Sequence, residues 1–179
     1  MRAFWANGYD GASVDVMCRV THMSRASLYG TYGGKEGLFL AAIDHYAQTR
    51  AAPVAMALGP DRTLAEDLAA FYAAVVTLAT SDAKTPGCLI SCVLADAAGT
   101  STVFRVELDR HFKTLEDRIA NRLRAAGWTD SATVPPTAAA GLAAAAARGI
   151  MLRARSGLPR DDLNKVATAA ARAVVGLRP

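Results

Sequence analysis

The stretch from Gly8 to Leu38, GYDGASVDVMCRVTHMSRASLYGTYGGKEGL, has the clearest local pattern in the chain. It predicts two short helices, over 13–21 and 24–30, separated by a tight turn. Ser13 and Ser24 stand at the helix starts, where a serine hydroxyl can accept a hydrogen bond from an unpaired N–H of the first turn. The second helix has only about two turns, so packing against its neighbours must hold it in place.

The second helix carries small, polar or hydroxyl side chains on most of its surface, at Ser24, Arg25, Ser27 and Tyr29. Leu28 is its one large aliphatic residue, and we expect it to face the core. A short polar helix presented in this way suits insertion into the major groove of DNA. Spacing alone leaves an ordinary helical hairpin without DNA contact as an equal alternative.

The same stretch resembles the DNA-binding domain of the TetR family of transcriptional repressors. The residues at matching spacing are Gly8-Tyr9, Ser13-Val14, Ser24, Leu28-Tyr29, Tyr32 and Lys35-Glu36-Gly37-Leu38. The chain departs from the family pattern in three places: His22 replaces a glycine, Thr31 replaces a histidine or tyrosine, and Tyr32 replaces a phenylalanine. The family's first helix also starts further upstream, after a basic arm, so we expect the first helix here to be truncated.

The resemblance implies a set of DNA contacts. Arg25, Ala26 and Ser27 are expected at base edges, with Arg25 able to form a bidentate pair with guanine. Phosphate contacts are implied for the hydroxyl side chains and the lysine that follow, and core packing is an equal alternative for Tyr32. The full predicted set is Ser13, Ser24, Arg25, Ala26, Ser27, Tyr29, Thr31, Tyr32 and Lys35.

Composition supports an all-α fold. Hydrophobic residues make up 52% of the chain, aromatic residues 7% and charged residues 20%, and alanine is abundant. The high apolar and moderate charged fractions exclude disorder. Alanine favours helices and is poor in strands, so we expect a mainly helical protein. Glycine and proline divide the chain into about nine helices. Beyond the first stretch, these are expected over 34–50, 62–81, 86–98, 102–126, 136–156 and 159–177.

We predict two domains, a helix-turn-helix DNA-binding domain over 1–48 and an antiparallel helical bundle over 49–179. The net charge of +4 permits a nucleic-acid partner without demanding one. Three cysteines are too few and odd in number for a disulfide framework. No signal peptide or membrane span is evident, so a cytoplasmic location without membrane association is expected.

The second domain is predicted to sense a ligand. Apolar residues recur at helical spacing there, which usually means core, yet a bundle rich in alanine can leave a cavity. A mostly apolar small-molecule effector with one or two polar anchors is expected. The candidate lining residues are Phe71, Tyr72, Val75, Ser91, Cys92, Phe104, Leu108, His111 and Met151.

The last two helices are predicted to form a homodimer interface. Small residues recur every four positions on one face of the first, and an apolar stripe follows the second. The predicted set is Gly141, Ala145, Gly149, Leu163, Val166, Ala170 and Val174. Burial of these residues inside one subunit is the alternative.

The predicted function is a TetR-type regulator that binds double-stranded DNA at a palindromic operator and is released by the effector, with no catalytic residues, metal or cofactor. A thiol-sensing regulator using Cys88 and Cys92 is one alternative, since both cysteines lie on one predicted helix. An α-helical enzyme is a weaker one, because only the Glu107–His111 pair could poise a base and a salt link explains it better. A ligand-binding protein without DNA binding is the third.

Overall fold

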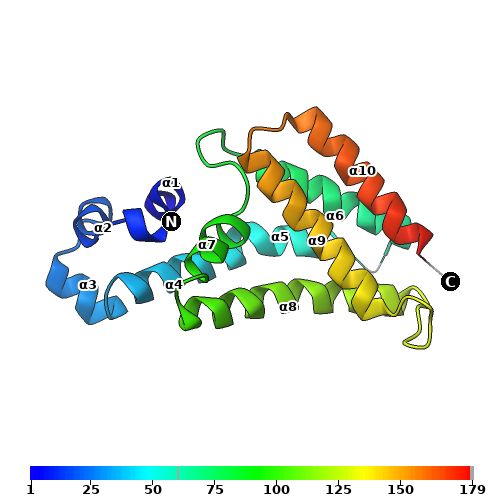
Figure 1. Cartoon of the computed structure of the whole chain (residues 1–179), viewed down its shortest axis with the longest axis horizontal. Helices are drawn as coiled ribbons and strands as arrows, with labels where there is room; N and C mark the ends of the chain where they lie inside the picture. Colours follow the sequence, from blue (N-terminus) through cyan, green and yellow to red (C-terminus); the bar gives the residue numbers. More distant parts are fainter. Residues whose placement is uncertain (60, 178–179) are drawn as a thin grey trace.

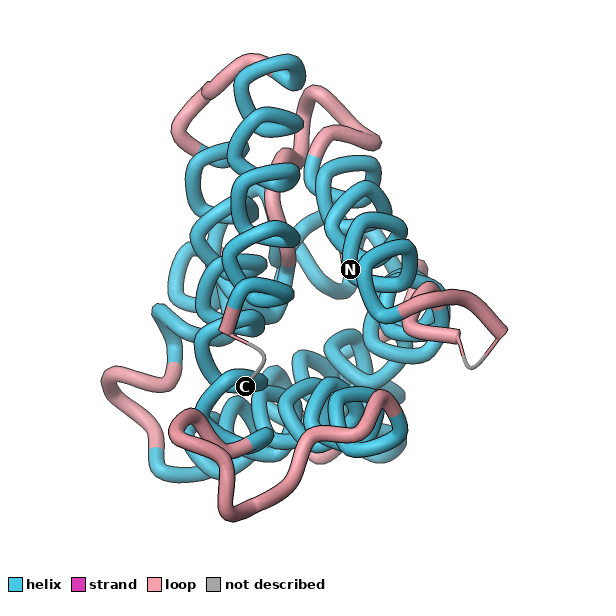
Figure 2. The backbone as a smooth tube through the Cα atoms, turned by 90° about the vertical axis from the view of Figure 1, so that its right-hand side faces the viewer, coloured by secondary structure: helices cyan, strands magenta, loops and turns pink. Residues whose placement is uncertain are grey.

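The computed structural model describes residues 1–59 and 61–177, and every regular element within these ranges is helical. Within these two ranges, twelve elements join into nine continuous helical segments, which confirms the predicted all-α class (Figures 1 and 2). The elements are α1 (Arg2–Gly11), α2 (Val14–Thr21), α3 (Arg25–Tyr32), α4 (Lys35–Tyr46), the π-helical η1 (Ala47–Ala51), α5 (Ala52–Met56), α6 (Leu64–Ala79), the π-helical η2 (Leu89–Leu94), α7 (Ala95–Ala97), α8 (Thr102–Ala125), α9 (Pro136–Arg155) and α10 (Arg160–Gly176).

Helices α1–α3 form a head at one end of the molecule (Figure 1). As predicted, Ser13 caps α2 by accepting from the Val16 N–H, and Ser24 caps α3 by accepting from the Ser27 N–H. His22 ends α2 in the left-handed region at φ 57°, where a residue other than glycine is strained by about 1 kcal/mol. The turn between the two helices therefore has the geometry for which the family uses glycine.

A glycine inside α4 sets how closely α3 and α4 approach. A Cβ atom at Gly37 would lie 1.7 Å from the carbonyl oxygen of Tyr32, a distance that no side chain can occupy. The Lys35-Glu36-Gly37-Leu38 motif thus begins helix α4 and also requires glycine at its third position, where any side chain would clash with Tyr32.

One long helical segment joins the head to the bundle. The prediction that this helix ends at residue 50 is wrong, because α4 continues through η1 and α5 as far as Met56. Pro53 has no N–H and its ring crowds the preceding turn, and the wider π-helical turn at Ala47–Ala51 accommodates it without a break. The predicted domain boundary at residue 48 consequently falls inside a continuous helix.

Helices α6, α8, α9 and α10 form the bundle (Figure 1). Helix α9 packs on the other three through fully buried alanines, whose small side chains allow close approach of the backbones. Tyr72 on α6 donates its hydroxyl to the Ala143 carbonyl oxygen at 3.0 Å and links the two helices. Among the described residues, no helix combines the length and apolar character needed to cross a membrane.

An aromatic cluster fastens the head to the bundle. The ring of Phe104 on α8 lies 4.7 Å from that of Tyr9 and 5.2 Å from that of Phe39, measured between centroids. Phe4 packs against Phe39 at 4.8 Å. Aromatic pairs in tilted and edge-to-face arrangements stabilise beyond the area that they bury. The core is therefore continuous from α1 to α8.

Candidate functional site

Helix α3 presents an exposed polar surface. Leu28 is fully buried and fixes the rotation of the helix, so that the opposite side faces solvent. The exposed residues of the predicted DNA-contact set are Ser13, Ser24, Arg25, Ala26, Ser27, Tyr29 and Thr31. The exposed side of α3 is polar apart from Ala26 and the ring of Tyr29, which is 52% exposed.

Arg25 has a partner that spacing did not reveal. Its guanidinium forms an ion pair with Asp15 on α2, at 2.8 Å, and both side chains are largely exposed. The hydrogen bond that Arg25 donates to Asp15, followed by the charge of Asp15, raises the pKa of Arg25. An exposed pair of this kind is weak, so Arg25 can exchange Asp15 for another acceptor at little cost.

Lys35 and Tyr32 are less exposed than the other predicted DNA contacts, and both pack against other residues of the head. The Lys35 ammonium sits 4.3 Å from the centre of the Tyr9 ring and donates to the Asp10 carbonyl oxygen at 3.3 Å. Tyr32 is half-buried against the core. Lys35 does begin α4, as predicted, so its backbone N–H stands at a helix N-terminus.

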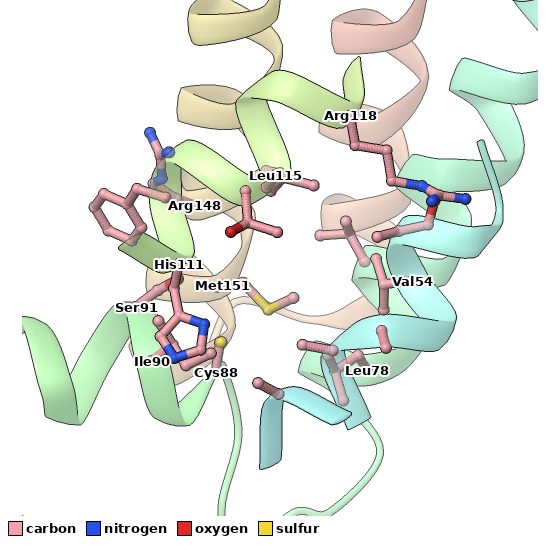
Figure 3. A pocket seen from close by; sticks show the side chains of 18 of the residues that line it. Val54, Leu78, Cys88, Ile90, Ser91, His111, Leu115, Arg118, Arg148 and Met151 are labelled. Carbon is pink, nitrogen blue, oxygen red and sulfur yellow. The ribbon is translucent and has the colours of Figure 1, made fainter. Parts of the chain in front are cut away.

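A cavity of about 330 Å³ opens between α5, α6, α8, α9 and η2 (Figure 3). Five of the nine predicted lining residues surround it: Phe71, Val75, Ser91, His111 and Met151. The residues that sequence analysis did not name are Ala47, Ala51, Ala52, Val54, Ala55, Met56, Leu78, Cys88, Ile90, Phe112, Thr114, Leu115, Arg118, Ala147 and Arg148.

The other four predicted residues do not line this cavity. Tyr72 turns its hydroxyl to α9, and Phe104 belongs to the aromatic cluster with the head. Cys92 lies against Gly87, where a Cβ would be 3.1 Å from its sulfur, and Leu108 packs half-buried on the core. All four side chains face inward, but they pack against other parts of the protein and not against the cavity.

A polar chain links the cavity to α4. His111 lies 2.9 Å from Glu107, Glu107 contacts Arg110, and Arg110 reaches Asp44 on α4 at 2.8 Å. Burial, followed by the charge of Arg110, lowers the pKa of His111. Asp44, Glu107 and His111 could together offer ligand atoms to a metal ion, but Arg110 already donates hydrogen bonds to both carboxylates. The Glu107–His111 pair is thus part of a salt-linked network.

Two arginines at the cavity were missed by sequence analysis, although a signal for them existed. On α8, Arg118 follows His111 and Leu115 at spacings of seven and three, which continues the same helix face. Arg148 on α9 follows Ala144 and Ala147. Extending each apolar stripe to its charged ends would have found both.

The outer faces of α9 and α10 carry exposed apolar side chains. Leu142, Leu152 and Val166 are 53%, 51% and 44% exposed. Gly141, Ala145, Gly149 and Ala170 from the predicted interface lie on or beside this surface, being exposed or half-buried. Leu163 and Val174 are instead buried inside the bundle, since they form the inner stripe of α10.

The two cysteines proposed as a thiol sensor lie in a buried environment. Cys88 is 6% exposed and Cys92 is half-buried. Burial raises the pKa of Cys92, which disfavours the reactive thiolate. These surroundings do not favour thiol sensing.

Comparison with known proteins supports the resemblance seen in the sequence. The family described as "Bacterial regulatory proteins, tetR family" matches residues 1–42. The HTH-type transcriptional repressor ComR of Escherichia coli (strain K12) is 31% identical over 91 residues, which are 50% of this chain and 43% of ComR. The chain therefore matches less than half the length of this curated relative.

Solved structures extend the likeness through the bundle. A cysteine mutant of the TetR family transcriptional regulator CifR, complexed with 26-base-pair double-strand operator DNA, has a TM-score of 0.82 and 27% identity. The match covers 96% of this chain and 91% of that one. The regulatory protein TetR from Rhodobacter sphaeroides has a TM-score of 0.79 and 25% identity, with 96% and 94% covered.

The head and its exposed α3 thus define a helix-turn-helix transcriptional regulator, whose second part is a helical bundle with a cavity. Within this class, residues 1–42 match the TetR family of bacterial regulatory proteins, and the fold of the described chain is that of solved TetR-family regulators. The relatives that carry this identification are regulators.

Proposed function

We propose that this chain is a homodimeric repressor that binds a palindromic operator and leaves it when a small, mostly apolar effector fills the cavity. The observation that carries the proposal is the exposed polar face of α3, held outward by buried Leu28 and by the Ser24 cap. In this proposal, residues 1–48 contact DNA, and residues 49–179 bind the effector and the second subunit.

Base and phosphate contacts divide along α3. Arg25 extends from the first turn of α3, where a guanidinium can reach the N7 and O6 atoms of guanine after releasing Asp15. Ala26 and Ser27 stand beside it at base edges. Tyr29 and Thr31 stand further along the helix, where hydroxyl groups suit phosphate oxygens.

Dimerisation through α9 and α10 would place two α3 helices on one DNA. The exposed apolar residues Leu142, Leu152 and Val166 form the centre of the proposed interface, and Gly141, Ala145 and Gly149 permit close approach. A two-fold interface of this kind matches a palindrome, because each subunit reads one half-site.

Release follows from the continuous helix between head and cavity. Residues of α5 and η1 line the cavity, and the same helical segment begins at Lys35 beside α3. An effector that binds better to one position of this segment shifts the head and spoils the spacing of the two recognition helices.

The decisive experiment is selection of bound duplexes from a genomic library, followed by gel shifts on the enriched sequence and light scattering of the complex. We expect a palindromic motif and two or four subunits on each duplex. A monomer that enriches no motif would refute the proposal.

The effector site has its own test in Ser91→Leu, which fills part of the cavity, compared with Asn121→Leu at an exposed position on α8. Overpacking of the cavity costs roughly 1–3 kcal/mol of stability. We expect the folded Ser91→Leu protein to keep its operator affinity within about tenfold, since the DNA-contacting head is unchanged. It should no longer respond to the inducer, whereas Asn121→Leu should respond normally. A normal response of both variants would move the effector site elsewhere.

A further inference from the structure

The charge around the cavity is one-sided. Arg118 and Arg148 are its charged lining residues in the described chain, and the ring of His111 also lines it. No aspartate or glutamate lines the cavity in residues 1–59 or 61–177. The rest of the wall is mostly apolar. Leu115 and Met151 are among its larger side chains (Figure 3), and Phe71 also lines it.

Arg148 already has its partners inside the protein. It pairs with Glu116 at 2.5 Å, and its guanidinium lies 3.8 Å from the centre of the Phe112 ring. Its charge is therefore compensated, although its Nε atom is buried without a hydrogen-bond partner. Arg148 therefore offers no vacant charged group to a ligand.

Arg118 is different, because its hydrogen-bond partner is neutral. Its Nε donates to the carbonyl oxygen of Ala55, in the last turn of α5, at 2.5 Å. No ion pair to Arg118 is formed within the described part of the chain. Its side chain is exposed and crosses from α8 to α5 at the edge of the cavity (Figure 3).

His111 does not compete for the same role. Burial and the neighbouring Arg110 lower its pKa, so the ring is largely neutral near pH 7. Its Nε2 is engaged with Glu107 at 2.9 Å. Among residues 1–59 and 61–177, the Arg118 guanidinium thus remains as the accessible cation at the cavity without a carboxylate partner.

We propose that the cavity binds a small amphipathic carboxylate, with its apolar body between Phe71, Leu115 and Met151 and its carboxylate paired with the Arg118 guanidinium. This inference rests on the proposed function for the identity of the cavity as the effector site. Guanidinium and carboxylate match as a two-bond fork, which is stronger and more directional than a bond to a carbonyl. The volume of about 330 Å³ lies at the lower end of ligand pockets, so a short chain or a single ring fits.

The test uses three ligands with one chain length: octanoate, octanamide and octylammonium. Binding to the full-length protein without DNA is measured by isothermal titration calorimetry. Octanoate is expected to bind about tenfold more tightly than octanamide, because only octanoate gains bonds between two charged groups. Octylammonium is expected not to bind, since the Arg118 guanidinium, which has no carboxylate partner within the described ranges, repels it.

Variants of Arg118 separate pairing from cavity fit. Arg118→Gln should reduce the preference for octanoate over octanamide to within about twofold, while octanamide binds as before. Arg118→Lys should retain part of the preference, because it keeps the charge without the fork. Arg105→Gln, an exposed arginine on the same helix, is the matched control and should leave both affinities unchanged.

Equal binding of octanoate and octanamide to the unmodified protein would overturn the inference. So would an unchanged preference in Arg118→Gln, or failure of octanoate, hexanoate and benzoate alike to bind. Gel shifts with the selected operator keep the two proposals apart. Arg118-dependent carboxylate binding without release of DNA would count against the proposed effector function alone. If octanamide released DNA and octanoate did not, the proposal that the ligand is a carboxylate would be wrong.

Discussion

The buried carboxylate of Asp67 should be the most sensitive charged position in the bundle. Asp67 on α6 is 0% exposed, and its two oxygens accept from Arg122 Nε at 2.6 Å and from Arg62 Nε at 2.9 Å. Arg122 also donates to the Gly59 and Arg62 carbonyl oxygens, at 3.1 and 2.8 Å. One carboxylate thus joins α6, α8 and the segment after α5.

The expected loss from Asp67→Ala is about 3 kcal/mol of unfolding free energy, at the lower end of the range for breaking a buried pair. The lower end applies because the Arg62 side chain is 47% exposed and can recover water, whereas Arg122, at 11%, cannot. With an unfolding entropy of about 2.1 cal/mol/K for each residue, this loss lowers Tm by about 8 °C.

Thermal unfolding followed by circular dichroism, together with urea titration, measures the change. Asp162→Ala removes an exposed pair with Lys165 and serves as the control, for which no measurable shift is expected. The double variant Asp67→Leu with Arg122→Met replaces the buried charges by apolar groups and should recover most of the lost stability. If Asp67→Ala behaved like Asp162→Ala, the burial argument would be refuted.

Three further predictions concern the DNA-binding head and the proposed interface. Arg25→Ala should weaken binding to the selected operator about tenfold and relax the base preference at one position of the site. Lys35→Ala should weaken binding to all duplexes alike and lower the slope of log affinity against log salt concentration by about one. Gel shifts at several salt concentrations would show whether the two roles differ. His22→Gly should raise Tm by about 3 °C, because it relieves about 1 kcal/mol of strain in a left-handed conformation, and a lower Tm would contradict that reasoning. Leu142→Arg and Val166→Arg should each yield monomers by light scattering, and an unchanged dimer would place the interface elsewhere.

Local chemistry in the head was predictable from sequence because it depends on residues three or four positions apart. The Ser13 and Ser24 caps and the strained His22 all follow from such short-range geometry. The end of the helical segment that begins with α4 was not predictable in this way. Pro53 ordinarily stops a helix, and only the π-helical turn before it allows the chain to continue.

The cavity was half predictable for a different reason. Periodicity identifies the inward face of a helix, but it does not tell which inward side chains meet a partner and which meet empty space. Phe104 and Tyr72 both face inward, but neither meets the cavity. Phe104 packs against Tyr9, and Tyr72 donates a hydrogen bond to Ala143, and both of these partners are distant in sequence. The partnership of Arg25 with Asp15 likewise depends on how α2 crosses α3.

The energy of one carboxylate–Arg118 pair would not by itself operate the proposed switch. Moving a two-state equilibrium from 1:99 to 99:1 requires a preference of about 10⁴-fold for one state, whereas one exposed ion pair supplies about tenfold. The remainder must come from apolar contacts that differ between the two states. The cavity is suited to this, because its walls belong to different elements, with Ala51 and Val54 on the segment that reaches the head and Leu115 on α8. The Asp44–Arg110 pair also joins α4 to α8, so any movement between the two helices must strain or break it. An effector that wedges α5 away from α8 would therefore act on the head through apolar contact area, with Arg118 selecting which molecules enter.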